Sequence, residues 1–349
     1  MSADKLLICD FDDERLFANK VFDYEISGKI SHTYQPLCFL KKFFQKYNFE
    51  LVTPDIFLSQ NKIPHGGAFL YSHLQTRYTG KLIKHGAHPL ILSCQESPYV
   101  ATRFYVDLPK ISSVFEHSFV FSGMERRLSS QTRYHQMFFP ESFDVNSLEY
   151  VPFNDKKLAI LMNSNKRIGS WKKNLAIKFF YGCDIREIYS ERYKIINFFS
   201  PLLALELYGP GWDKGGKNRI ETENIFRIYR GFAENKRQKL KSYKFVFTFE
   251  NAIFPGYITE KIFDAMFAGC VPVYFGAPDI DKYIPRDCFI DYRNFSNLRD
   301  LHQFLSNMDE IKYGDYISNI KKYLFSGSYR KFTQEAFAEE LLDILMKKD

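Results

Sequence analysis

The sequence lacks the loops that mark several large enzyme classes. It contains no Walker loop, no G-x-S-x-G elbow and no G-x-G-x-x-G fingerprint, which weakens an NTPase, hydrolase or dehydrogenase interpretation. It has no uninterrupted apolar run of about 18 to 20 residues, so no membrane-spanning helix is expected. Its first residues show neither the basic leader nor the long apolar core of a signal peptide.

Cysteine is scarce and scattered. The six cysteines form no C-x-x-C pair, and most stand in apolar surroundings, which is typical of reduced core thiols in a cytosolic protein. We therefore expect a cytoplasmic location. The net charge of +7 adds a basic surface that favours peripheral contact with the inner face of a membrane.

The 349 residues are enough for two domains with separate cores, and 45% hydrophobic with 26% charged residues indicates a globular protein. The positive charge favours anionic partners such as nucleotides or phospholipids, but acidic residues interrupt the basic runs. No nucleic-acid-binding module is visible, so nucleic acid is not an expected partner.

Short apolar runs alternate with helical patterns along the chain, which predicts an α/β fold with parallel sheets. Expected strands lie at 6–11, 49–53, 89–94, 118–121, 158–162, 205–208, 245–249, 271–275 and 288–292. Expected helices lie at 37–47, 80–86, 171–180, 192–199, 298–308 and from 314 to the C-terminus, and 134–153 is expected to be a connector. We predict a Rossmann-like domain at 1–150, a second at 151–330 and a last helix at 331–349 that packs back on the first domain.

The most informative segment is 244–276, KFVFTFENAIFPGYITEKIFDAMFAGCVPVYFG. Two apolar runs flank one helix, which Thr259 is suited to cap and Gly269 to end. This is the pattern of a βαβ unit. Its polar residues follow the first strand and open the helix, where such units bind phosphate.

Lys261 and the free N–H groups of that helix's first turn would bind a diphosphate, while Glu260 is better suited to accept hydrogen bonds from sugar hydroxyls. Glu250, Asn251 and Tyr257 converge on the same edge. An ordinary capped helix with a solvated Glu–Lys pair fits these residues equally well.

Glu96 is the candidate general base because it directly follows an apolar run in the first domain. On the residues alone, a surface glutamate in a turn before Pro98 explains it better. Asp10, Asp12 and Asp13, and separately Asp279 and Asp281, invite a magnesium interpretation. Solvated loops account for both groups better, and we predict neither a metal nor an essential cofactor.

The segment 243–276 resembles the motifs of α1,3-fucosyltransferases, glycosyltransferase family 10. The resemblance rests on Tyr243-Lys244-Phe245, Phe249-Glu250-Asn251, Tyr257-Ile258-Thr259-Glu260-Lys261 and Val271-Pro272-Val273, with Lys236, Leu240 and the run 207–212 fitting upstream. It covers the second half of the chain well and the first half loosely.

The resemblance implies GT-B architecture, with two facing Rossmann-like domains and the active site in the cleft between them. It also implies an inverting transfer of L-fucose from GDP-β-L-fucose to a hydroxyl, expected to be O3, of GlcNAc or glucose in a glycan. The acceptor would be N-acetyllactosamine-like or of lipopolysaccharide type. Lys261 matches the diphosphate-binding lysine, Glu260 the ribose-binding glutamate, Asn251 and Tyr257 donor-site positions, and Glu96 the catalytic base.

One departure from the family pattern concerns the phosphate-binding arginine. The family places it shortly after a Ser-Asn pair, present here as Ser164-Asn165, but Arg192 follows only after a long insertion. Arg167 is nearer, yet Arg192 opens a segment that matches the family's helix, so we favour Arg192. A different GDP-6-deoxyhexose donor, or a non-catalytic nucleotide- or glycan-binding protein, remains open at this point.

Overall fold

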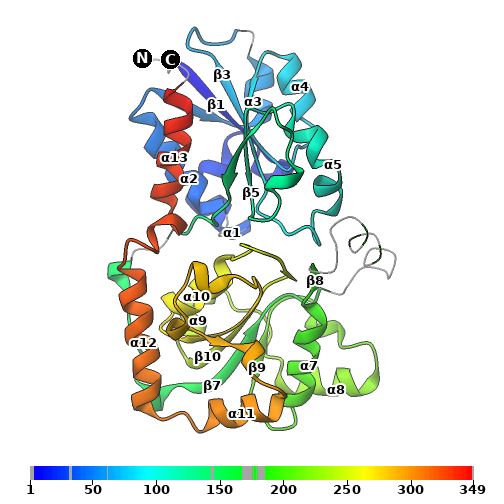
Figure 1. The fold of residues 1–349 in the computed structure, drawn as a ribbon, viewed down its shortest axis with the longest axis vertical. Helices are drawn as coiled ribbons and strands as arrows, with labels where there is room; N and C mark the ends of the chain where they lie inside the picture. The colour runs from blue at the N-terminus through cyan, green and yellow to red at the C-terminus, as the bar shows by residue number, and fades with distance from the viewer. Residues whose placement is uncertain are drawn as a thin grey trace. The chain divides into compact units, whose positions relative to one another are not determined.

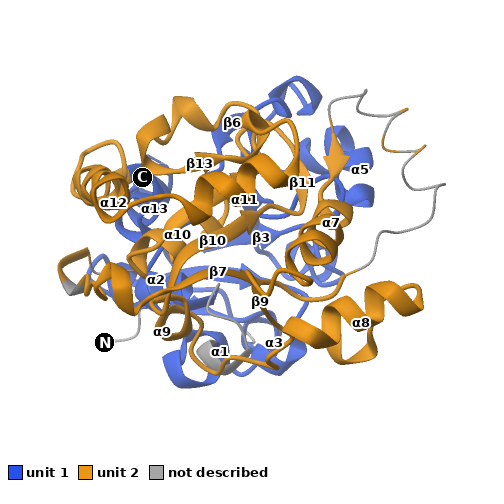
Figure 2. Cartoon of the chain, turned by 90° about the horizontal axis from the view of Figure 1, so that it is seen from below, with its two compact units in different colours: residues 1–142, 331–349 blue, residues 143–330 orange. Residues whose placement is uncertain are grey.

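The computed structural model describes residues 4–30, 34–60, 62–142, 145–166 and 185–347, together with residues 175, 177 and 179. The chain divides into two compact units (Figure 2). Unit 1 is Met1–Ser142 with Lys331–Asp349, and unit 2 is Phe143–Arg330. The C-terminal segment thus belongs to the same unit as the N-terminal half.

Unit 1 is built on a six-stranded, all-parallel sheet in the order β2-β1-β3-β4-β5-β6. The strands are β1 (Lys5–Asp10), β2 (Phe49–Val52), β3 (Ala68–His73), β4 (His88–Ser93), β5 (His117–Val120) and β6 (Arg133–Gln136). The helices are α1 (Tyr24–Ile30), α2 (Gln35–Gln45), α3 (Pro54–Ser59), α4 (Thr79–Lys84), α5 (Thr102–Ser112) and α13 (Gln334–Met346). Figure 1 shows α2 and α13 side by side on one side of the sheet, with α4 and α5 on the other.

Unit 2 has a second all-parallel sheet, in the order β13-β12-β10-β7-β9, and a two-stranded antiparallel ribbon of β8 and β11. The strands are β7 (Lys157–Met162), β8 (Arg186–Glu187), β9 (Glu206–Tyr208), β10 (Tyr243–Phe249), β11 (Ala252–Ile253), β12 (Val271–Phe275) and β13 (Ile290–Asp291). The helices are α7 (Tyr189–Phe199), α8 (Arg219–Ile228), α9 (Lys236–Leu240), α10 (Glu260–Phe267), α11 (Leu298–Ser306) and α12 (Glu310–Leu324).

Helices cover both faces of the unit 2 sheet, which explains why the buried positions of its strands are mainly apolar. Phe245, Phe247 and Phe249 of β10 pack into a core shared with α7, α8 and α11. Val246 turns the opposite way into a second core with residues of α9 and α10. Since side chains alternate along a strand, a strand buried on both faces is mainly apolar, and the buried Thr248 hydroxyl donates to the Val273 carbonyl at 3.3 Å.

The expected strands and helices are largely confirmed, but α1, α3, α5, α8, α9 and the β8–β11 ribbon have no counterpart among the expected elements. Three further differences concern β6, the last helices and β3. The expected connector 134–153 contains β6, a short, half-exposed edge strand whose RYHQ sequence carries no apolar run. The helix expected from residue 314 onward is two helices, α12 and α13, because the chain turns at Ser326-Gly327-Ser328 and Thr333 caps a new helix by accepting from the Ala336 N–H. β3 has no counterpart among the expected strands. The helix expected at 171–180 lies outside the described residues, apart from isolated positions.

None of the described helices is both long enough and apolar enough to cross a lipid bilayer.

A buried charge cluster joins α9 to α10. Asp264 is 1% exposed, and its two carboxylate oxygens lie 2.6 Å from Lys236 Nζ and 2.9 Å from Arg237 Nε. Replacing Asp264 with asparagine is expected to lower the free energy of unfolding by about 2 kcal/mol, because it leaves two part-buried cations without their counter-charge. Urea unfolding measures this loss. The matched control is Glu223→Gln, which breaks the exposed Arg219–Glu223 pair and should change stability little. Equal effects of the two substitutions would contradict the interpretation.

Candidate active site

The residue that precedes α10 is held in place by a side chain that directly follows β10. Thr259 occupies the N-cap position with extended backbone, but its own side chain caps no helix N–H. Instead, the Thr259 N–H donates to Glu250 Oε1 at 2.9 Å, and the Thr259 hydroxyl donates to Glu250 Oε2 at 2.7 Å. At the other end Gly269 ends the helix with φ of 65°, as the sequence predicted.

Lys261 is held at this helix terminus by two carboxylates. Its Nζ lies 3.3 Å from both Glu250 Oε2 and Glu260 Oε1, and it donates to Thr259 Oγ1 at 2.9 Å. Burial lowers the pKa of Lys261, but the Glu260 and Glu250 charges outweigh burial, so the pKa is raised overall. The side chain is therefore a fixed cation, 13% exposed, at the positive end of a helix.

Glu250 faces inward. It is fully buried, and burial raises its pKa despite the opposing charge of Lys261. Gly276 packs directly against it, since a Cβ there would lie 2.5 Å from Glu250 Cγ. The carboxylate thus positions Thr259 and Lys261 and presents no surface to a ligand. Its role as a holder of Lys261 could not be read from the sequence.

Arg192 joins α7 to the same strand end. Its Nη2 donates to the carbonyl oxygens of Phe249 and Glu250, each at 3.0 Å, and to Asn251 Oδ1 at 3.1 Å. The guanidinium lies 4.8 Å from the centre of the Tyr189 ring. Burial lowers its pKa, but an arginine stays protonated at neutral pH. Its buried Nε has no hydrogen-bond partner within the described part of the chain.

The remaining predicted donor-site residues lie beside Arg192. The Asn251 amide donates to the Tyr257 hydroxyl at 3.4 Å, and Tyr257 is 1% exposed. The loop between them is fixed by Asp279, which accepts from the Gly256 N–H at 2.8 Å. The structure therefore brings together Arg192, Glu250, Asn251, Tyr257, Glu260 and Lys261. Arg167 lies outside the described residues.

Two further loops, after β7 and after β9, contact each other next to α7. The sequence indicated a role for them only through the family resemblance. Asn165, after β7, donates to the Gly211 carbonyl at 2.9 Å and accepts from the Tyr193 hydroxyl. Gly209 has φ of 126°, and a Cβ there would lie 2.3 Å from the Asn163 carbonyl oxygen. Glycine is therefore required for this close approach of two loops. The hydrogen bond between Tyr193 and Asn165 links the loop after β7 to α7, the helix that carries Arg192.

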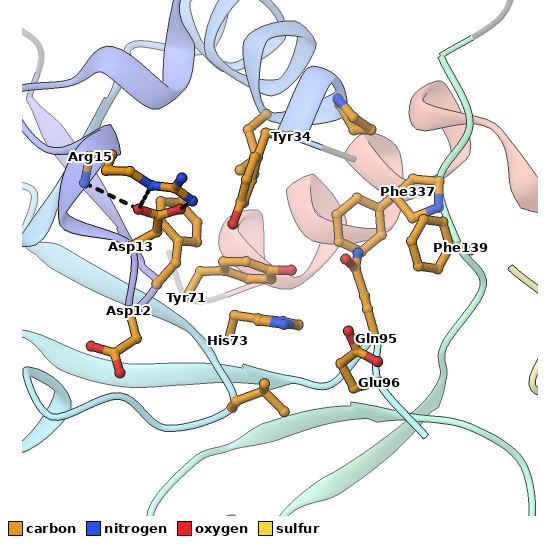
Figure 3. A pocket seen from close by; sticks show the side chains of 15 residues that line it. Asp12, Asp13, Arg15, Tyr34, Tyr71, His73, Gln95, Glu96, Phe139 and Phe337 are labelled. Atoms are coloured by element: carbon orange, nitrogen blue, oxygen red, sulfur yellow. Dashed lines mark hydrogen bonds and ion pairs between the residues drawn. The ribbon is translucent and has the colours of Figure 1, made fainter. Parts of the chain in front are cut away.

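Glu96 lies in a separate pocket, within unit 1, with a volume of about 550 Å³. It follows β4, and its backbone carbonyl accepts from the Tyr105 hydroxyl at 2.9 Å and from Cys94 Sγ at 3.3 Å. Figure 3 shows Glu96 beside Gln95 and His73, facing a space bordered by Tyr34 and Tyr71. The backbone of the candidate base is thus fixed at the edge of a cavity large enough for a small ligand.

His73 lines the same pocket and provides a test by pH. Burial lowers its pKa to about 4, so the folded protein holds it neutral while the unfolded chain protonates it below about 6.5. The stability that neutral His73 allows is therefore fully present at neutral pH, and it is lost as the pH falls from about 6.5 towards 4. Between pH 7 and 4.5 the wild type should lose about 2 kcal/mol more stability than His73→Asn, measured by urea unfolding. Identical losses would show that His73 is not buried neutral.

The acidic groups considered for a metal have other partners. Asp10 accepts from the hydroxyls of Ser72 and Thr79, and Asp281 pairs with Arg286 at 2.6 Å. In the described ranges no group of three or more His, Cys, Asp or Glu side chains is arranged to hold a metal ion.

The fold has counterparts among solved structures. The chain is similar to HepE of Anabaena, solved with UDP-glucose, with a TM-score of 0.57 and 11% identity over 98% of this chain and 99% of that one. It is also similar to an α1,3-fucosyltransferase solved with GDP, with a TM-score of 0.50 and 16% identity over 98% and 90% of the two chains. Two parallel α/β units of this kind are the GT-B glycosyltransferase fold, which confirms the predicted fold class.

The second half of the chain matches a known protein family. Residues 170–339 match the family described as glycosyltransferase family 10 (fucosyltransferase) C-terminal. The resemblance predicted from the motifs of this segment is therefore confirmed over these residues.

Curated relatives match over shorter stretches. The mouse 4-galactosyl-N-acetylglucosaminide 3-alpha-L-fucosyltransferase 9 is 31% identical over 40% of this chain and 33% of its own length. The alpha-(1,3)-fucosyltransferase of Helicobacter pylori is 39% identical over 23% of this chain and 16% of its own. GDP-fucose protein O-fucosyltransferase 3 of Xenopus laevis is 40% identical over 20% and 15%. The chain thus spans a third or less of each of these relatives.

Proposed function

We propose that this protein is an inverting α1,3-fucosyltransferase that transfers L-fucose from GDP-β-L-fucose to O3 of GlcNAc or glucose in a glycan. The observation that carries the proposal is the assembly around Lys261, inside the segment that matches family 10, of every predicted donor-site side chain that the structure describes. An α1,3-type fucosyl linkage stands in the names of the mouse and Helicobacter relatives and of the solved fucosyltransferase. GDP-fucose stands in the name of the Xenopus relative.

The donor diphosphate would be bound by Lys261, the first-turn N–H groups of α10 and Arg192. A lysine fixed at a helix N-terminus attracts phosphate through its charge and the helix dipole together. Glu260 would accept hydrogen bonds from the ribose hydroxyls, and Asn251 and Tyr257 would complete the donor site. Glu250 would act through Lys261, which it orients.

The choice between two arginines has a direct test. Arg192→Ala should weaken GDP binding, and Arg167→Ala should leave it unchanged. The opposite result would assign the phosphate contact to Arg167.

The transfer itself would be a single displacement. The Glu96 carboxylate takes the proton of the acceptor hydroxyl as that oxygen attacks the anomeric carbon of fucose. The bond from this carbon to the β-phosphate oxygen breaks, its electron pair leaves with GDP, and the configuration inverts. Lys261, Arg192 and the helix terminus stabilise the charge on the leaving diphosphate.

We propose that no metal is required, because these fixed positive groups supply the charge that a divalent cation would otherwise provide. Activity should survive EDTA. Abolition by EDTA, with recovery on adding magnesium or manganese, would contradict this.

The test of the proposed function is incubation of the protein with GDP-fucose and N-acetyllactosamine, with detection of both GDP and the glycosylated product. GDP-fucose should be used far better than GDP-mannose. Transfer from another GDP-6-deoxyhexose in place of fucose would keep the reaction and change the donor. GDP binding without product from a panel of neutral glycans, including lipopolysaccharide-type acceptors, would favour a non-catalytic binding protein. Cosedimentation with anionic vesicles tests whether the basic surface holds the protein at a membrane.

A further inference from the structure

The pocket that contains Glu96 has an uneven charge. Its described charged lining residues are Asp12, Asp13, Glu96 and Arg15, three carboxylates and one cation. The described aromatic lining residues are Phe11, Tyr34, Tyr71, Phe139 and Phe337. Aromatic rings with a few polar groups suit the apolar faces and hydroxyls of sugars.

The charge of Arg15 is already neutralised by its neighbour. Arg15 Nε donates to Asp13 Oδ1 at 2.8 Å, and Nη2 donates to Asp13 Oδ2 at 2.6 Å, as Figure 3 shows. The Asp13 carboxylate also accepts from the Arg15 backbone N–H at 3.1 Å. These hydrogen bonds lower the pKa of Asp13, so the carboxylate is ionised at neutral pH. A two-point pair of this kind holds the guanidinium in a fixed orientation.

Tyr34 occupies the wall between this ion pair and Glu96. Burial raises the pKa of its hydroxyl, and Asp13 and Glu96 raise it further against the opposing effect of Arg15. The hydroxyl is therefore neutral and can donate to a sugar oxygen, while its ring offers a flat apolar surface. Asp13 and Glu96 line the pocket together with Tyr34, so an anion entering there would meet the Glu96 carboxylate and would find Arg15 already paired with Asp13.

We infer that this pocket binds an electrically neutral sugar unit of the acceptor and rejects a sugar that carries a carboxylate or phosphate. The inference rests on the proposed function, in which Glu96 acts on an acceptor hydroxyl. It adds that Asp13 sets the specificity by holding Arg15 away from anionic ligands. Asp12 contributes less to the exclusion of anions, because its side chain is 60% exposed and its carboxylate lies 3.2 Å from Arg77 Nε.

The test uses two lactosides that differ only in charge, with the glucose C6 as a carboxylate in one and as a carboxamide in the other. Their affinities for the full-length protein, without donor, are measured by isothermal titration calorimetry at low salt. The carboxamide should bind about tenfold more tightly, and the ratio should shrink as salt screens the charges. Equal affinities, tighter binding of the carboxylate, or no binding of either glycan would overturn the inference.

Asp13→Asn sharpens the result because it releases Arg15. In this variant the carboxylate lactoside should gain affinity about tenfold or more, while the carboxamide changes little. Asp12→Asn is the matched control, with a smaller gain expected. Thermal unfolding of each variant checks the fold, and the wild-type comparison decides the inference should Asp13→Asn be unstable.

Binding and turnover separate this inference from the proposed function. A tenfold binding preference with no fucose transfer to any glycan would sustain the pocket's specificity and refute the fucosyltransferase proposal. Equal fucose transfer to both lactosides would support the fucosyltransferase proposal and refute the specificity of the pocket.

Discussion

Lys261→Ala is expected to lower kcat/KM for GDP-fucose by about 10³-fold and to raise the Kd of GDP by at least tenfold. The substitution removes the cation at the α10 terminus, which lies 3.3 Å from each of two carboxylates. Loss of one charged hydrogen-bond donor to a leaving group costs about 10²–10³ in rate. An additional loss follows because Glu250 and Glu260 then repel the diphosphate without a neighbouring lysine. Steady-state kinetics and calorimetry measure the two effects.

Lys241→Ala provides the matched control. Lys241 is in the same unit and pairs at 2.7 Å with the exposed Glu149, so its removal changes the net charge equally and should leave GDP binding unaffected. A GDP affinity in Lys261→Ala equal to that of the wild type would refute the diphosphate role of Lys261.

Glu96→Gln is expected to lower kcat by about 10³-fold while leaving the affinity for GDP-fucose unchanged. Glutamine keeps the size of the side chain and cannot take a proton from the attacking hydroxyl, a contribution of about 10²–10⁴ in rate. Donor affinity is expected to persist because every proposed donor contact lies in unit 2. Single-turnover kinetics at saturating donor, together with GDP-fucose titration, separate the two quantities.

Glu125→Gln serves as the control, since Glu125 lies in an exposed turn of the same unit. Transfer undiminished in Glu96→Gln would remove Glu96 from the chemistry and leave the base unidentified. A parallel loss of donor affinity would indicate a folding effect.

The unit that carries the proposed donor site could be predicted from the sequence because its determinants are local. β10, α10 and β12 form one βαβ unit of residues close in the chain, and the apolar runs, Thr259 and Gly269 mark its boundaries. Arg192 comes much earlier in the chain than this unit, and only its place in a helix that matches the family pattern linked it to the same site. The order of these motifs within a segment that matches family 10 made the prediction specific.

Other features depend on contacts between distant residues, which no local pattern reveals. The sequence predicts Glu250 as a donor-site residue, but in the structure it is buried and contacts Thr259 and Lys261. β6 is too short and too polar to be recognised alone, and it forms only because β5 pairs with it. The ion pair of Asp13 with Arg15 is local, but its place in one pocket with Tyr34 and Glu96 requires the whole of unit 1.

The most direct test of the central claim is the structure of the product formed from GDP-β-L-fucose and N-acetyllactosamine, determined by mass spectrometry and NMR. We expect one fucose, α-linked to O3 of the N-acetylglucosamine, formed by the wild type and not by Lys261→Ala in the same time. A β-linked product, or no fucosylated product from a protein that binds GDP-fucose, would contradict the account.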